Sequence, residues 1–141
     1  WLIATRGGAG DIADDARVTA LLDLNAPATA AMAARLKDAI DRRLQDGLPT
    51  LPNCQLLYAW DVNGIELSSM VRAKGPDPSW RGRDLTDRPY LKNHLPFKGV
   101  MLSSVYLSKY TNEHCLTALQ AVSRDSLLLG FIAADFAMSC T

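Results

Sequence analysis

The side chains best suited to recognise a charged small molecule lie together in one stretch of the chain, residues 72–98. This stretch holds seven basic residues and three acidic ones, which gives it a net charge of +4. Arginine guanidinium groups match the planar geometry of carboxylate and phosphate groups, so one interpretation is a binding site for an anion. The alternative is a solvated basic loop. The basic residues are Arg72, Lys74, Arg81, Arg83, Arg88, Lys92 and Lys98.

Residue types used in catalysis are few and poorly arranged. His114 and Cys115 are neighbours, and successive side chains of a strand point to opposite faces, so the two cannot form a nucleophile–base pair. The other histidine, His94, could meet Cys115 only through the fold, and no pattern orients it. The acidic residues lack metal-ligand spacing, and no phosphate-binding glycine loop or zinc-protease motif is present. We therefore expect no catalytic residues, no metal, no cofactor and no enzyme activity.

Composition excludes several other classes of protein. Fifteen Lys and Arg balance fifteen Asp and Glu among 141 residues, so bulk charge attracts neither nucleic acid nor an anionic membrane. The longest apolar runs, such as residues 127–134, are too short to span a bilayer. Three cysteines without CxxC spacing are expected to be small buried side chains rather than redox or metal groups.

The elements that must position the basic stretch begin with two predicted helices. Residues 12–24 have an amphipathic pattern of moderate quality. Asn25-Ala26-Pro27 ends this helix and starts a second one, which Gly47 ends. The second helix carries an apolar stripe of Met32, Leu36, Ile40 and Leu44. We divide the chain into N-terminal helices, residues 1–47, for signalling, dimerisation and sheet packing, and a sheet region, residues 48–141, which together form one domain.

Strand-like patterns fill most of the remaining chain. Gln55–Trp60 and Ile65–Arg72 flank a strong hairpin signal at Asn63-Gly64. A proline-bearing loop is predicted over Ala73–Asp84, followed by a short helix over Arg88–His94. Three further strands are predicted at Val100–Ser108, Cys115–Ser123 and Leu127–Phe136. This order indicates an α+β fold, a five-stranded antiparallel sheet with a long N-terminal helix and a helical crossover, as in PAS-like domains.

Four short segments between residues 56 and 136 carry a family resemblance. They are Asp61–Ser68 (DVNGIELS), Trp80–Leu91 (WRGRDLTDRPYL), Leu102–Ser108 (LSSVYLS) and Leu129–Phe136 (LGFIAADF). In this order and spacing they resemble the motifs of Cache domains, the PAS-like small-molecule sensors of bacterial chemoreceptors, histidine kinases and diguanylate cyclases.

The resemblance implies a ligand pocket between the sheet and the crossover segment. In the amino-acid-sensing branch, an arginine two residues before an aromatic grips the ligand carboxylate, a tyrosine on the next strand assists, and an aspartate ending the last strand binds the ammonium. Aromatic rings wall such a pocket. With two neighbouring candidates added, the ligand-binding residues that the resemblance implies are Arg88, Tyr90, Tyr106, Asp135, Ser104 and Arg83.

Two positions depart from that branch. Leu91 stands where a second aromatic is usual, and Arg83 stands where a tyrosine is usual. Less aromatic wall and an added cation shift the expectation from a zwitterion toward a plainer carboxylate or another anion. The expected ligand is therefore a small carboxylate or an amino acid.

Each candidate also has an interpretation that involves no ligand. Arg88 can form a surface ion pair with Asp84 or Asp87. Asp135 can cap the segment after its strand, and Tyr106 can pack on the sheet.

We therefore predict a non-catalytic sensor in which a bound ligand favours one arrangement of the N-terminal helices. Its expected partners are a small anionic or zwitterionic metabolite, a second copy joined through the N-terminal helix, and an output signalling domain that is not in this chain. The alternative is a protein–protein interaction module of the profilin or roadblock kind, in which side chains fill the space of the pocket. The resemblance implies a periplasmic or extracytoplasmic position if the chain is cut from a membrane receptor, and a cytoplasmic position is the alternative.

Overall fold

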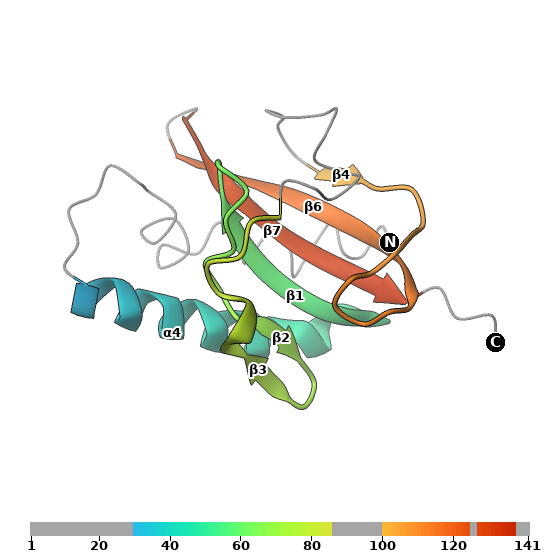
Figure 1. Ribbon diagram of the computed structural model, residues 1–141, viewed down its shortest axis with the longest axis horizontal. Coiled ribbons are helices and arrows are strands. Elements are labelled where there is room, and N and C mark those ends of the chain that lie inside the picture. Colours follow the sequence, from blue (N-terminus) through green and yellow to red (C-terminus); the bar gives the residue numbers. More distant parts are fainter. Residues whose placement is uncertain (1–29, 86–99, 125–126, 138–141) are drawn as a thin grey trace.

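One antiparallel sheet makes up most of the computed structural model, which describes residues 30–85, 100–124 and 127–137 (Figure 1). Its strands are β1 (Cys54–Asp61), β2 (Met70–Arg72), β3 (Gly75–Asp77), β4 (Val100–Leu102), β5 (Tyr106–Leu107), β6 (His114–Arg124) and β7 (Leu127–Ala137). They lie in the order β3-β2-β1-β7-β6-β4, and β5 also pairs with β6. The predicted α+β class is confirmed, with the long strands β1, β7 and β6 at its centre.

A long helix, α4 (Ala30–Gly47), continues into the short 3-10 helix η1 (Leu48–Thr50) and packs on one face of the sheet (Figure 1). Ile40 and Leu44 are fully buried in a cluster that includes Leu57 of β1 and Ile132 of β7. A helix places residues four apart on one face, so Ile40 and Leu44 of the apolar stripe form the packing surface. The side chain of Met32 lies outside the described part of the chain. The predicted sheet-packing helix is confirmed, including its end at Gly47.

A second apolar cluster covers the opposite side of the sheet. Because side chains alternate along a strand, Leu57 and Ala59 face α4, whereas Tyr58 and Trp60 face the other way. The Trp60 ring stacks on Phe131 with 4.3 Å between centroids. We call this side the aromatic face. Its buried members are Leu56, Tyr58, Trp60, Met70, Leu85, Leu119, Ala121, Phe131 and Ala133.

The predicted turn after β1 is present, but the strand predicted over Ile65–Arg72 is wrong for most of its length. Gly64 takes a φ of 81°, and its N–H donates to the Asp61 carbonyl at 3.0 Å, which closes the turn. Pairing then lapses because Ser68 Oγ accepts a hydrogen bond from the Ala59 N–H at 2.8 Å, where a strand would offer a backbone carbonyl. Regular pairing resumes only in β2.

The loop predicted over Ala73–Asp84 contains two regular elements. β3 pairs with β2 at the sheet edge, and the 3-10 turn η2 (Pro78–Trp80) follows it. Pro76 belongs to β3, and an edge strand tolerates a proline because one side of the strand needs no partner. The proline signal was therefore compatible with an edge strand.

The strand predicted over Val100–Ser108 is divided into β4 and β5. Leu102 pairs with Ala118 and Tyr106 with Cys115, so four steps on one strand oppose three on the other. This is a β-bulge, and Ser103 Oγ accepts from the Thr117 N–H within it at 2.8 Å. This division and β3 bring the described sheet to seven strands instead of five. The strands predicted at Cys115–Ser123 and Leu127–Phe136 are confirmed as β6 and β7.

The helices predicted at residues 12–24 and 88–94 lie outside the described residues. Within the residues that are described, no helix has the length and apolarity needed to cross a membrane.

Candidate functional site

Asp135 is a buried carboxylate on the aromatic face, near the end of β7. Only 2% of the residue is exposed. Its Oδ1 accepts a hydrogen bond from Thr117 Oγ1 at 2.7 Å and another from Tyr58 Oη at 3.0 Å. Thr117 is the direct cross-strand partner of Asp135 on β6, and Tyr58 comes from β1. Three adjacent strands therefore build this site.

A tyrosine from β5 extends the network. Tyr106 Oη lies 2.7 Å from Thr117 Oγ1. A threonine hydroxyl has one proton, and Thr117 donates it to the Asp135 carboxylate, so Tyr106 is the donor in its contact with Thr117. The hydroxyl groups of Tyr58, Thr117 and Tyr106 all point their protons toward the carboxylate end of the network. Such an arrangement stabilises a buried negative charge.

The charge of Asp135 acts on a neighbouring thiol. Burial, with the negative charge of Asp135 as the second cause, raises the pKa of Cys54 from 9.0 to about 12. Cys54 and Cys115 both carry free thiols. Cys115 is buried, as expected from the sequence, whereas Cys54 is only partly buried. Cys54 therefore stays protonated at neutral pH and is a poor nucleophile.

A groove of about 410 Å³ opens at the start of β1, and Leu56 is part of its lining. Leu56 is also the cross-strand partner of Asp135, so the groove lies close to Asp135. Arg72, Lys74 and Tyr110 also line it. Its volume lies within the range of small-molecule sites. Tyr110 Oη donates to Asp77 Oδ2 at 2.6 Å, and this bond is the main cause that lowers the pKa of Asp77 to about 2.

The predicted ligand residues fall into three groups. Tyr106 and Asp135 meet through Thr117. Ser104 is exposed in the bulge between β4 and β5, and Arg83 is exposed with its guanidinium carbon 4.2 Å from the centre of the Trp80 ring, a cation–π contact. Arg88 and Tyr90 lie outside the described residues.

Sequence reasoning missed Tyr58 and Thr117. Thr117 was visible as one of two polar residues, with Gln120, in the mostly apolar stretch Cys115–Val122. Its position opposite Asp135 depends on the register of β6 against β7, which no local pattern specifies.

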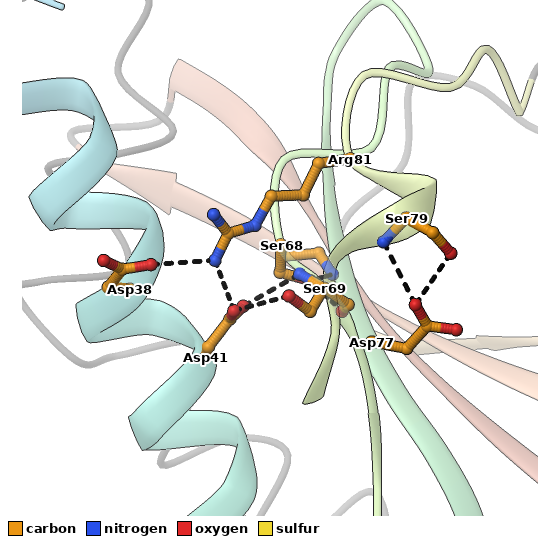
Figure 2. Close-up of polar contacts among 8 residues, drawn as sticks. Asp38, Asp41, Ser68, Ser69, Asp77, Ser79 and Arg81 are labelled. Carbon is orange, nitrogen blue, oxygen red and sulfur yellow. Dashed lines mark hydrogen bonds and ion pairs between the residues drawn. The ribbon is translucent and has the colours of Figure 1, made fainter. Parts of the chain in front are cut away.

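A second polar cluster, also missed, joins α4 to the chain after β3 (Figure 2). Arg81 Nη2 donates to Asp38 Oδ1 at 3.0 Å and forms a second ion pair with Asp41 Oδ2. Asp41 is buried and also accepts from the N–H and the hydroxyl of Ser69, at 2.8 and 2.6 Å. Partial burial opposes the charged form of Arg81, but the two carboxylates outweigh it and raise the Arg81 pKa above its ordinary value.

No protein-family model and no curated protein matches this sequence. Solved structures do match. The ligand-binding domain of the Campylobacter jejuni chemoreceptor Tlp3 in complex with 4-methylisoleucine is 19% identical, with a TM-score of 0.66, over 94% of this chain and 48% of that one. The sensory domain of Tlp3 with isoleucine bound is 16% identical, with a TM-score of 0.67, over 94% of this chain and 49% of that one.

The sensor domain of a histidine kinase has a similar structure as well. The sensor domain of the V. cholerae histidine kinase DctB is 20% identical, with a TM-score of 0.63, over 98% of this chain and 46% of that one. The chain thus spans about half the length of these solved domains. At this level of identity the likeness is one of fold, and it confirms the Cache-type, PAS-like fold that the four sequence segments predict.

Proposed function

We propose that this chain is a non-catalytic ligand-sensing domain that binds a small carboxylate or an amino acid on the aromatic face and passes on a conformational signal. The observation that carries the proposal is the Asp135 carboxylate, buried on a sensor-type fold and held by the hydroxyl groups of Thr117 and Tyr58. The fold likeness to sensory domains favours this function over an interaction module of the profilin or roadblock kind.

An amino acid fits the chemistry of the face. An α-ammonium group would bind the carboxylate of Asp135, and the hydroxyl of Tyr106 would lie beside it. The apolar aromatic face would contact an aliphatic side chain. The isoleucine and 4-methylisoleucine bound by Tlp3 are ligands of this kind, which supports testing aliphatic amino acids first.

Arg88 and Tyr90 complete the proposed site from the crossover segment, with Arg88 taking the ligand carboxylate. Arg83 and Ser104 are the remaining proposed contacts. If the ligand lacks an ammonium, these cationic and polar groups would dominate its binding and Asp135 would oppose it.

The proposed output is a change in the arrangement of the N-terminal helices. We propose that residues 12–24 form the contact between two copies in a homodimer, and that an output domain elsewhere in the full protein receives the signal. Ligand binding can drive such a change only as far as the ligand prefers one arrangement over the other.

A thermal-shift screen of amino acids and small carboxylates tests the proposal. A ligand at a hundred times its Kd adds about 2.7 kcal/mol of stability, which at this chain length raises the Tm by several degrees. Arg88→Ala should abolish the shift and leave the Tm without ligand nearly unchanged, because a pocket arginine serves the ligand rather than the core. Arg42→Ala, an exposed arginine on α4, is the matched control and should keep the shift. The proposal fails if no compound shifts the Tm or if Arg88→Ala unfolds the domain.

A further inference from the structure

The segment from Pro78 to Leu85 touches both sides of the sheet with neighbouring side chains. Trp80 packs against the aromatic face and meets the Tyr110 ring edge to face, with 5.2 Å between centroids. Arg81, the next residue, reaches Asp38 and Asp41 on α4, which covers the opposite side (Figure 2). We call this segment, residues 78–85, the strap.

The strap is bonded to its surroundings along its length. Gly82 N–H donates to the Glu66 carbonyl at 2.7 Å, and Glu66 N–H donates to the Arg83 carbonyl at 2.9 Å. Leu85 N–H donates to the Gly64 carbonyl at 2.7 Å. A segment with this many hydrogen bonds has little freedom to move independently of the turn after β1.

Asp41 is the point where three elements meet. This one buried carboxylate binds the strap through Arg81 and the chain before β2 through Ser69, and it belongs to α4 itself. A buried ion pair adds little net stability but is costly to break from one side, which suits a specific positional contact. Asp38, with 64% of its side chain exposed, adds a weaker second contact.

The Arg81 contact is not in the geometry that an arginine prefers. A single nitrogen, Nη2, serves both carboxylates, while Nε is buried with no hydrogen-bond partner in the described part of the chain. A two-nitrogen grip on one carboxylate would be stronger. A shift of α4 along the strap would therefore change the geometry of this contact.

We infer that Arg81 is the positioning residue that couples the aromatic face to α4, so that the state of the ligand site sets the position of the helix. The inference builds on the proposed function and extends it to signal output. Trp80 contacts the aromatic face, and the next residue, Arg81, contacts α4.

The test is hydrogen exchange of α4 in the full chain, first without any ligand. Trp80→Ala disturbs the aromatic-face end of the strap and should raise exchange at the amides of residues 38–44 by about fivefold or more, a typical coupling. In an Arg81→Met background, Trp80→Ala should add no further increase there. In the matched Arg42→Met background the full increase should remain. A merely structural Arg81 would instead give the same Trp80→Ala increment in all backgrounds, and that result would overturn the inference.

A conservative variant guards against loss of folding. Arg81→Lys keeps a charge that can reach Asp41 but loses the planar group, and it should retain part of the coupling. If Arg81→Met does not fold, the same comparison in Arg81→Lys decides: an undiminished Trp80→Ala increment contradicts the inference, and a reduced one supports it.

Hydrogen exchange measured with a ligand present distinguishes this inference from the proposed function. Saturating L-isoleucine should change α4 exchange in the wild type, and in Arg81→Met it should still bind but leave α4 exchange unchanged. If L-isoleucine fails to bind either protein, that amino acid is excluded as the ligand, and the ligand-free comparison still decides the role of Arg81.

Discussion

At the scale of single residues, the site depends on how a buried carboxylate keeps its charge. Hydroxyl donors on neighbouring strands compensate the loss of water around Asp135. Thr117 makes two hydrogen bonds in this network, because it donates to Asp135 and accepts from Tyr106. Thr117 is therefore the residue whose removal disturbs the network most.

Thr117→Val removes the hydroxyl and keeps the shape of the side chain. It leaves Asp135 with one donor fewer and Tyr106 without this acceptor, so we expect a loss of about 1–3 kcal/mol in the free energy of unfolding, measured with urea. Thr117→Ser keeps the hydroxyl and should lose clearly less. Equal stability of the valine variant and the wild type would contradict this account of the network.

The thiol of Cys54 reports on the charge of Asp135. Because burial and that charge raise the Cys54 pKa to about 12, alkylation of Cys54 by iodoacetamide should stay slow at pH 9, where an ordinary thiol is half ionised. Peptide mass spectrometry resolves Cys54 from the other cysteines.

Asp135→Asn is the matching variant. It removes the second cause of the shift, so the Cys54 pKa should fall and labelling at pH 9 should become faster. The raised pKa of Cys54 also makes stability depend on pH. The unfolded chain loses the thiol proton at a lower pH than the folded chain does, so the free energy of unfolding should decline between pH 9 and 12. A wild-type labelling rate with its midpoint near pH 9 would refute this description.

Motif resemblance predicted Asp135 and Tyr106 as site residues because both stand in recognisable segments. It could not predict Tyr58 or Thr117, since their roles depend on cross-strand geometry. The charge pattern placed Arg81 only in a basic stretch, because its partners lie 40 and 43 residues earlier in the chain.

At the scale of elements, α4 shows how far periodicity alone can go. The stripe of Ile40 and Leu44 predicted both the helix and the face that it buries. The prediction of a strand at Ile65–Arg72 failed because side-chain contacts outweighed the local sequence pattern. Its apolar content is strand-like, but the hydroxyl groups of Ser68 and Ser69 bind the Ala59 N–H and the Asp41 carboxylate, and those contacts take the chain out of the ladder.

Leu44→Ala should cost about 2–5 kcal/mol of the free energy of unfolding, because the residue is fully buried between α4 and the sheet. Leu36→Ala removes the same group from a partly exposed position on the same helix and should cost clearly less. Urea unfolding of both variants measures the difference. Equal losses would mean that the stripe does not divide into buried and partly exposed positions as described.

At the scale of the whole molecule, the order of elements was enough to predict the fold class. Consecutive antiparallel strands after a long helix leave few arrangements, and the fold likeness to sensory domains agrees with the predicted one. The number of strands was not predictable. It depends on a bulge and on an edge strand that contains a proline, which are local departures from period-two alternation.

Assembly is the next prediction at this scale. If residues 12–24 join two copies, deletion of residues 1–24 should leave a folded monomer, because Ile40 and Leu44 of α4 pack on the sheet without that segment. Sedimentation velocity of the full and shortened chains measures this. An unchanged oligomeric state after the deletion would contradict the proposed dimer contact.

Binding on the aromatic face is the central claim, and calorimetric titration with a matched ligand pair tests it most directly. L-isoleucine carries an ammonium, and its 2-oxo acid, 3-methyl-2-oxopentanoate, has a carbonyl in its place. We predict that Asp135→Ala changes the ratio of the two Kd values in favour of the oxo acid by about tenfold or more, the contribution of one charge-assisted hydrogen bond. Asp46→Asn, an exposed carboxylate on α4, should leave the ratio unchanged. If the wild type binds neither compound, or if Asp135→Ala leaves the ratio as it is, Asp135 is not the ammonium-binding group of this site.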